Sequence, residues 1–175
     1  MENTENKEEI PHEQVSGDLP LAQVIANRWI EAFNTRNLAA ITALYAPDAE
    51  LYDSGMHQPR RGLVQIESWF RLRFAGMPAN VYAPETYHLA DSEHISVEWT
   101  LYGRSPALLG QSWLAHPFQV RGTSTFVLRD ALICKQQGSY EHLFVLRQVL
   151  PWLRFAPAAL LHMVYALYLL RHRQW

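Results

Sequence analysis

The sequence predicts a single α+β domain, which we place at residues 18–142. In the first part of the chain apolar residues recur three or four positions apart, as on the buried face of a helix. From about residue 80 they alternate with polar residues, as in strands. Helices followed by a run of hairpin-linked strands are typical of the α+β class. The 175 residues suit one domain, and an apolar content of 49% is enough for a core.

Three helices are expected before the long strands. The first begins near Pro20 with Asp18 as its cap, and the second is short, capped by Asn37 and ended by Ala46-Pro47-Asp48. The third follows a loop over residues 54–61. The residues expected to face inward are Ile25, Trp29, Ala32 and Phe33 in the first helix, Leu38, Ile41, Leu44 and Tyr45 in the second, and Leu63, Ile66, Phe70 and Phe74 in the third.

Five strands are expected, the last four of them where apolar and polar residues alternate. They cover residues 49–53, 84–90, 94–103, 117–129 and 131–142. Asp91-Ser92 and Arg129-Asp130 have the composition of hairpin turns, and residues 104–116 form a longer loop. The four later strands therefore predict an antiparallel meander.

The two ends of the chain differ from this domain. Residues 1–17 are acidic and almost free of apolar side chains, so a disordered tail is expected. Residues 143–175 are expected to form an apolar helical extension, because 158–170 is apolar on every face except at His162. Thirteen helical residues reach about 20 Å, short of the roughly 30 Å hydrocarbon core, so a transmembrane span is not expected. The domain itself, a second subunit or a membrane surface, the last through residues 156–173, would then cover this helix.

Composition excludes several classes of function. A formal net charge of −2 leaves no basic field for nucleic acid. Cys134 is the lone cysteine, so an internal disulfide is impossible and a reducing, cytoplasmic setting is expected. Phosphate-binding glycine loops and the motifs of zinc proteases and serine hydrolases are absent. His88 and His94 flank a predicted turn without a third ligand, so neither a metal ion nor a cofactor is expected.

Several sequence motifs occur together in a recognisable order. Residues 28–70 contain "LYAPDAELYD" and then "PRRG" before "IESWF", residues 95–104 read "ISVEWTLYGR", and residues 120–133 read "VRGTSTFVLRDALI". Over residues 20–142 the chain resembles the SnoaL-like polyketide cyclases and ketosteroid isomerases of the nuclear-transport-factor-2-like superfamily. The resemblance implies a cone, in which a strongly bent antiparallel sheet wraps around the N-terminal helices. It also implies a pocket for a small hydrophobic molecule and a homodimer formed through the sheet face.

Asp53 is the sharpest catalytic candidate. Alternation along residues 49–53 places its carboxylate on the same face as two apolar residues, Ala49 and Leu51, and an apolar cavity would make it a stronger base. The resemblance places it where ketosteroid isomerases keep the aspartate that shuttles a proton. Asp53-Ser54-Gly55 is also a common turn composition, so the carboxylate is alternatively expected to bond the turn amides, which would argue against catalysis.

The rest of the isomerase pattern is altered. By resemblance, Trp29 stands at the position of the oxyanion-binding tyrosine, and Thr125 at that of the protonated acid. An indole N–H and a hydroxyl are weaker donors to a developing enolate than a phenol or a carboxylic acid. Trp29 also lies on the apolar stripe of its helix, so it is alternatively a core residue.

Two further residues are catalytic candidates. His57 follows Asp53 by four residues and titrates near neutral pH, so it could relay a proton, or it is simply solvated. Glu141 ends the last predicted strand, where relatives with the same fold carry an aspartate. The acid–arginine arrangement of the epoxide hydrolases with this fold is broken, because Ser96 stands in place of the arginine. Glu98 is expected on a solvent or interface face.

The remaining pocket candidates are mostly aromatic, with a few polar side chains for orientation. The substrate-binding residues expected in addition to Trp29 and Thr125 are Tyr45, Trp69, Phe70, Val97, Trp99, Arg121, Gln136 and Tyr140.

Three functions remain open from the sequence. One is a cofactor-independent isomerase, cyclase or hydro-lyase acting on a small hydrophobic carbonyl compound, with Asp53 as general base. The second is a binding module that uses the same cavity without chemistry. The third is an interaction protein that oligomerises or contacts a membrane. Because one fold serves many functions, the fold cannot choose among them.

Overall fold

The computed structural model describes residues 19–76, 80–104 and 117–141, together with the single positions 144, 148, 157, 159, 160 and 163. The expected acidic tail lies outside the described residues, and so does most of the expected C-terminal helix. No helix in the described part is long and apolar enough to cross a membrane.

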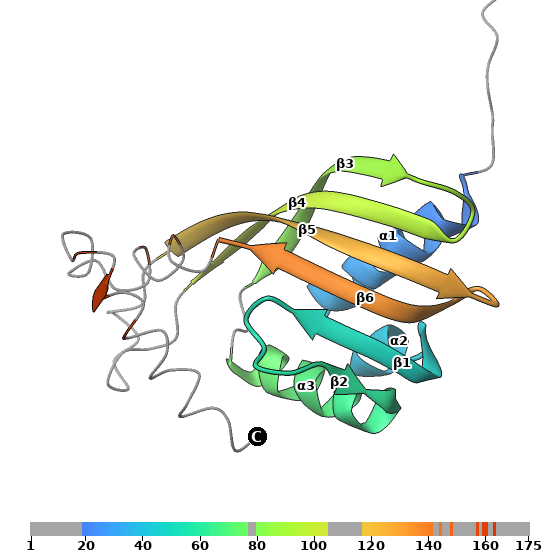
Figure 1. Cartoon of the computed structure of the whole chain (residues 1–175), viewed down its shortest axis with the longest axis horizontal. Coiled ribbons are helices and arrows are strands. Elements are labelled where there is room, and N and C mark those ends of the chain that lie inside the picture. The colour runs from blue at the N-terminus through green and yellow to red at the C-terminus, as the bar shows by residue number, and fades with distance from the viewer. Residues whose placement is uncertain are drawn as a thin grey trace, which may run out of the picture.

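Three helices and six strands make up the described domain (Figure 1). The helices are α1 (Leu21–Asn34), α2 (Leu38–Thr42) and α3 (Gly62–Gly76). The strands are β1 (Tyr45–Asp53), β2 (Arg60–Arg61), β3 (Val81–Leu89), β4 (His94–Arg104), β5 (Pro117–Arg129) and β6 (Leu132–Tyr140).

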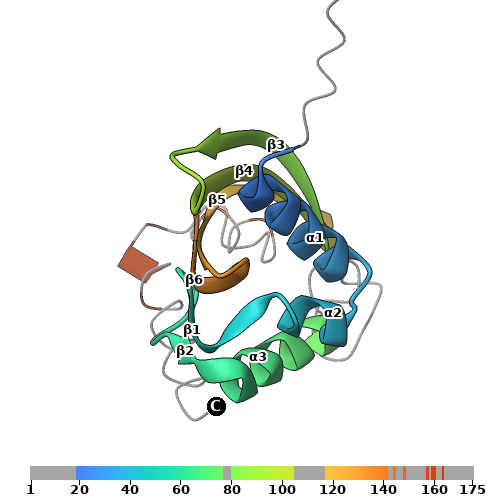
Figure 2. The same cartoon turned by 90° about the vertical axis from the view of Figure 1, so that its right-hand side faces the viewer.

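All six strands belong to one sheet with the order β2-β1-β6-β5-β4-β3. Every neighbouring pair is antiparallel except β1 and β6, which run parallel. The sheet bends into an arc around α1, and α2 and α3 lie beside β1 (Figure 2). The α+β class and the bent sheet around N-terminal helices are confirmed.

Local sequence explains how the helices begin. The Asn37 side chain accepts a hydrogen bond from the Ala40 amide at 2.9 Å, which confirms it as the cap of α2. Helix α1 starts directly after Pro20, a residue whose fixed φ is compatible with a helix start, and the expected cap, Asp18, is outside the described residues. The predicted Asp91-Ser92 turn is present, and Asp91 accepts the amides of Glu93 and His94.

One boundary was predicted wrongly. Ala46-Pro47-Asp48 was expected to end a helix before a short strand, but β1 already begins at Tyr45. Tyr45 pairs with Ile133 of β6, and the register then shifts between Tyr45 and Glu50. A proline is tolerated in a strand at such an irregularity because no regular ladder bond is lost there. The pairing partner lies far along the chain, so local composition could not reveal it.

The concave side of the sheet is filled with aromatic rings. Trp29 of α1 is 2% exposed, and its ring lies 5.5 Å from both Phe33 and Tyr82 and 5.6 Å from Phe126. Phe70 of α3 is fully buried and joins the same cluster, with its ring centroid 6.2 Å from Trp29. This cluster fixes the helices against the sheet and defines which strand residues face inward.

Candidate functional site

The ends of β1, β6 and α3 and the start of β3 lie at one end of the sheet, on the left in Figure 1. Four polar residues there act on one another, because Asp53, Tyr82 and Tyr140 all affect the charge of Arg73. Asp53 is the last residue of β1 and Tyr140 the last of β6, whereas Tyr82 lies at the start of β3 and Arg73 in the last turn of α3. We call these four residues the strand-end cluster. They come from four elements, and Asp53 and Tyr140 are distant in sequence, so the fold brings them together.

The Asp53 carboxylate has two distinct oxygens. The residue is only 8% exposed, and its Oδ1 accepts the Gly55 amide at 2.8 Å. This is the turn bond expected as the alternative to a catalytic role, and it is formed by one of the two oxygens. Asp53 pairs with Gly138 of β6, and a Cβ at position 138 would lie 3.2 Å from Asp53 Oδ2. Glycine at 138 therefore leaves room for this oxygen on the inner face. No hydrogen bond to Oδ2 is formed among the described residues.

The Arg73 guanidinium stacks on one wall of the cluster. Its central carbon lies 5.3 Å from the centre of the Trp69 ring, a cation–π arrangement. Burial by itself would lower the pKa of Arg73, but the neighbouring Tyr82, Tyr140 and Asp53 raise it above its usual value, so the group stays charged. Its Nε is buried and has no hydrogen-bond partner in the described structure.

The Tyr82 phenol lies between Arg73 and the aromatic core. Burial raises the pKa of Tyr82 to about 12, and a hydrogen bond with Arg73 and the positive charge of that residue only partly oppose the shift. The Tyr82 ring packs edge-on against Trp99, with centroids 4.7 Å apart, and Trp99 in turn lies 6.3 Å from Tyr140. Tyr82 is therefore a neutral hydroxyl group at physiological pH.

Three predicted binding residues instead form a closed network deeper in the fold. The Trp29 indole N–H donates to the Tyr45 hydroxyl at 2.8 Å, and that hydroxyl donates to Gln136 Oε1. All three residues are buried, and burial strongly raises the pKa of Tyr45. We call Trp29, Tyr45 and Gln136 the central network. The indole N–H that the resemblance offers to a substrate oxygen is therefore already used within the protein.

Other predicted lining residues belong to the packed core. Phe70 and Val97 are almost fully buried, and the Trp99 indole N–H donates to Ser124 Oγ at 2.9 Å. Trp69 is half-buried beside Arg73. Of this set, Trp69 and Trp99 adjoin the strand-end cluster.

Thr125 and Arg121 lie on the opposite, outer face of the sheet. Thr125 is within hydrogen-bonding distance of Ser96, at 2.9 Å between their hydroxyl oxygens, and Arg121 has a side chain 78% exposed. The buried neighbour that faces inward is Ser124, not Thr125. Because successive side chains alternate across a strand, a shift of one position moves the assignment to the other face. The structure therefore does not bring Thr125 or Arg121 to the interior.

The remaining catalytic candidates are also outside the cluster. His57 is exposed in the loop after β1, and no described hydrogen bond links it to Asp53. Glu141 is exposed directly after β6. Glu98 lies on the outer face, with its Oε1 3.2 Å from His88 Nε2, as expected for a solvated position. Of the three catalytic candidates, only Asp53 is buried.

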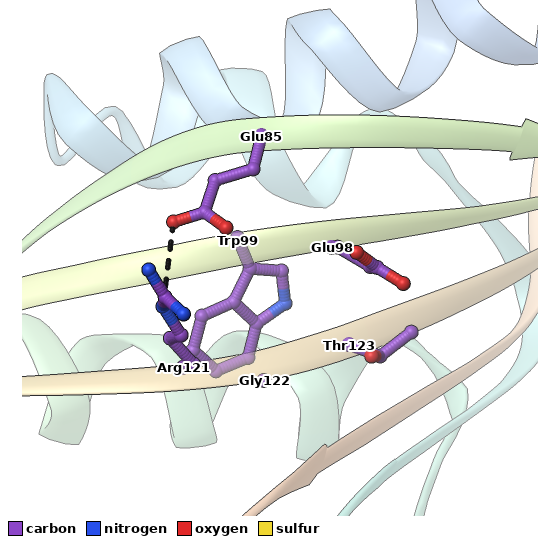
Figure 3. A pocket seen from close by; sticks show the side chains of 6 residues that line it. All are labelled: Glu85, Glu98, Trp99, Arg121, Gly122 and Thr123. Atoms are coloured by element: carbon purple, nitrogen blue, oxygen red, sulfur yellow. Dashed lines mark ion pairs between the residues drawn. The ribbon is translucent and has the colours of Figure 1, made fainter.

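The outer face carries a shallow groove of about 280 Å³ (Figure 3). Its lining residues are Glu85, Glu98, Trp99, Arg121, Gly122 and Thr123. Glu85 is the extra residue where the register of β3 shifts, and such bulges redirect side chains. Its carboxylate accepts the Thr100 hydroxyl and lies 3.8 Å from Arg121 Nε. The groove is thus polar and internally paired.

Arg73, Tyr82 and Gly138 were not predicted as site residues. Arg73 follows Phe70 by three positions and Ile66 by seven, so it continues the buried stripe of α3, where a charged residue is unusual. That signal was available from the sequence. Within the described residues, no group of three metal-ligating side chains is found.

Comparison with known proteins agrees with the fold. A family model described as a SnoaL-like domain matches residues 26–136. No curated protein sequence matches the chain.

Solved structures share the same fold. A protein with a ketosteroid isomerase-like fold from Catenulispora acidiphila, in complex with trimethylamine, has a TM-score of 0.62 and 23% identity, covering 71% of this chain and 91% of that one. A protein described as a putative SnoaL-like polyketide cyclase, from Shewanella denitrificans, has a TM-score of 0.65 and 15% identity, covering 74% of this chain and 97% of that one. A protein called TerC, co-crystallised with polyporic acid, has a TM-score of 0.62 and 12% identity, covering 74% and 98%.

These structures establish the fold, and the family model covers more than half of the chain. The chain belongs to the SnoaL-like domain family.

Proposed function

We propose that this protein is a cofactor-independent isomerase, cyclase or hydro-lyase that acts on a small hydrophobic carbonyl compound at the strand-end cluster. Asp53 is the general base. The observation that carries the proposal is a buried carboxylate whose second oxygen, Oδ2, faces a glycine and accepts no hydrogen bond from a described residue.

The two oxygens support different tasks. The Gly55 amide holds Oδ1, which orients the carboxylate without a second side chain. Oδ2 lies above Gly138 and can accept a proton from a carbon next to a carbonyl group. Removing a proton in this way leaves negative charge on the carbonyl oxygen, which needs a donor. The neutral Tyr82 hydroxyl, at the other side of the cluster, is suited to that role.

A binding module without chemistry is the second candidate, and one observation favours it. The bond from the Gly55 amide to Asp53 Oδ1 is also the bond that a purely structural aspartate turn forms. The trimethylamine and polyporic acid complexes of the structural relatives concern small-molecule binding, which both candidates require.

Deuterium exchange separates the two candidates. The probe is 2-tetralone in D₂O, and NMR follows the loss of protons next to its carbonyl group. Asp53→Asn keeps an oxygen that can accept the Gly55 amide but removes the base, so we expect exchange to slow by at least about 100-fold. Asp48→Asn, an exposed aspartate at the start of the same strand, is the matched control and should exchange at the wild-type rate. Equal exchange by wild type and Asp53→Asn would refute catalysis and leave the binding module.

We also propose that the outer face of the sheet mediates homodimer formation. Support comes from the side chains on this face. Tyr102 is a large ring that is 49% exposed, and Glu98 and Arg121 carry opposite charges that could pair with those of a second copy. The groove of Figure 3 lies in the same face. Light scattering tests the idea, since Arg121→Glu should convert a dimer to a monomer. A monomeric wild type would overturn it.

A further inference from the structure

Arg73 is a half-buried cation whose buried Nε has no acceptor, although the Asp53 carboxylate lies near enough to act on its charge. In the described structure its Nε has no acceptor, and no carboxylate lies within 4.0 Å of its guanidinium nitrogens. Its contacts are the Trp69 ring and the Tyr82 hydroxyl, which carry no formal charge at neutral pH. Leaving a charged donor buried and unpaired costs free energy, so such a group points to an acceptor supplied from outside.

The shape of the surroundings limits what that acceptor belongs to. Aromatic rings from three elements border the cluster, namely Trp69 of α3, Trp99 of β4 and Tyr140 of β6. Flat ring systems pack favourably on such side chains, whereas a flexible chain gains less. The guanidinium is planar, permanently charged and well matched to an oxygen anion.

We propose that Arg73 binds an anionic oxygen of the ligand, and that the ligand class is a planar aromatic or conjugated compound with an ionised carboxylate, phenolate or enolate. The proposal rests on the proposed function for the location of the site, and it adds the charge and shape of the ligand. Asp53 of β1 and Arg73 of α3 act on each other electrostatically, so a ligand bound at this cluster would be near both a carboxylate and a cation. Arg73 should therefore strengthen the binding of an anion, and Asp53 should weaken it.

Calorimetry with two matched probes tests this assignment. The probes are 2-naphthoate, which carries a carboxylate, and 2-naphthalenemethanol, which is neutral and has the same ring system. We expect wild type to bind 2-naphthoate at least ten times more tightly than the alcohol. Arg73→Gln should weaken 2-naphthoate at least tenfold and change the alcohol less than twofold. Asp53→Asn should tighten 2-naphthoate, because it removes a negative charge from the same site.

Arg71→Gln is the matched control. Arg71 lies on the same helix, but it is exposed and pairs with Glu67. This variant should bind both probes like wild type. Circular dichroism checks that Arg73→Gln is folded, because the variant alters the hydrogen bond with Tyr82 and the cation–π contact with Trp69.

Each other result has a defined meaning. Equal weakening of both probes by Arg73→Gln, or no weakening of 2-naphthoate, would overturn the role of Arg73 while leaving a binding site in place. Wild type that binds the alcohol but not 2-naphthoate would overturn the ligand class and leave the proposed function intact. Loss of deuterium exchange in Asp53→Asn together with unchanged probe selectivity in Arg73→Gln would support Asp53 as the base and overturn the role of Arg73. Binding of neither probe by wild type would overturn this proposal, and catalysis would then stand only on 2-tetralone exchange.

Discussion

The central network is buried and the strand-end cluster is partly buried, and their polar groups are used differently. In the central network, the Trp29 indole, the Tyr45 hydroxyl and the Gln136 carbonyl bond one another in sequence. In the strand-end cluster, one nitrogen of Arg73 lacks an acceptor and one oxygen of Asp53 lacks a donor among the described residues. A buried network that is internally complete stabilises the fold, whereas an incomplete one favours binding.

This difference separates residues that the sequence groups together. Trp29, Tyr45 and Gln136 were predicted as binding residues, but each now has its partner within the protein. We therefore expect substitutions in the central network to reduce mainly stability, and substitutions in the strand-end cluster to reduce mainly ligand binding or activity.

The largest expected effect comes from Tyr45→Phe. Removing this hydroxyl leaves two buried groups, the Trp29 N–H and the Gln136 oxygen, without a partner. The free energy of unfolding in urea should fall by about 2–4 kcal/mol. Tyr52→Phe, on the same strand and half-buried, is the control and should change stability by less than about 1 kcal/mol. A loss no larger than that of the control would contradict the structural role of the central network.

Two glycine substitutions test whether the strand-end cluster is packed less tightly than the core. A Cβ at Gly122 would lie 2.5 Å from the Ser139 carbonyl oxygen and 2.5 Å from the Trp99 ring, so Gly122→Ala should destabilise by about 1–3 kcal/mol. The atom nearest to a Cβ at Gly138 would be Asp53 Oδ2, at 3.2 Å, and this side-chain atom can shift slightly.

Gly138→Ala should therefore lose less than about 1 kcal/mol of stability but reduce 2-tetralone exchange, because it displaces the proposed base. Urea unfolding and the exchange assay measure the two effects. Gly76→Ala is the control, since a Cβ there has no neighbour within 4 Å. Similar stability losses at 122 and 138 would show that the strand-end cluster is packed as tightly as the core.

Alkaline pH should produce the next largest loss of stability. An unfolded tyrosine ionises near its ordinary pKa of 10.0, whereas burial raises the pKa of Tyr82 to about 12 in the folded protein. The folded state therefore holds its proton where the unfolded state releases it, and stability falls as the pH rises from about 10 toward 12. The buried Tyr45, whose pKa is also raised, contributes in the same direction.

Urea unfolding at pH 8, 10 and 11 measures this loss, with about 1.4 kcal/mol per pH unit as the upper limit for one group. Tyr82→Phe should lose stability less steeply than wild type above pH 10. Tyr102→Phe, which alters an exposed ring, should follow the wild-type slope. Identical slopes for Tyr82→Phe and wild type would show that Tyr82 is not the titrating group.

The smallest effect is expected at the surface. Arg129 pairs with Asp48, but both side chains are more than half exposed, at 54% and 67%. Exposed ion pairs contribute between about 0 and 1 kcal/mol, so Arg129→Gln should change the unfolding free energy by less than about 1 kcal/mol. A larger loss, measured in 0.5 M salt where such pairs are screened, would mean that Arg129 does more than form this pair.

Much of the fold could be predicted because its signals are local. The cap at Asn37, the helical stripe through Trp29 and the turn at Asp91 all depend on neighbours within a few residues. The start of β1 at Tyr45 could not be predicted in this way, since it depends on pairing with Ile133.

The site was harder to predict because it depends on register and on distant partners. Thr125 and Ser124 are adjacent in sequence but lie on opposite faces, and only the ladder from Ser96 to Thr125 decides which one is inward. Arg73 did carry a signal, as a charge on an apolar stripe, but its partners Tyr82 and Tyr140 come from strands that begin or end after the helix. Local patterns locate such a residue without revealing its role.

The parallel pairing of β1 with β6 also affects the order in which the chain folds. During synthesis β1 emerges early, but in the described sheet its partners are the two-residue β2 and β6, the last of the six strands to be made. The edge of β1 that later faces β6 therefore remains unpaired until nearly the whole domain has left the ribosome. Contacts between such distant segments slow folding, and a long-exposed strand edge promotes misassembly. The same closure assembles the strand-end cluster, so ligand-binding ability should appear only in the final stage of folding.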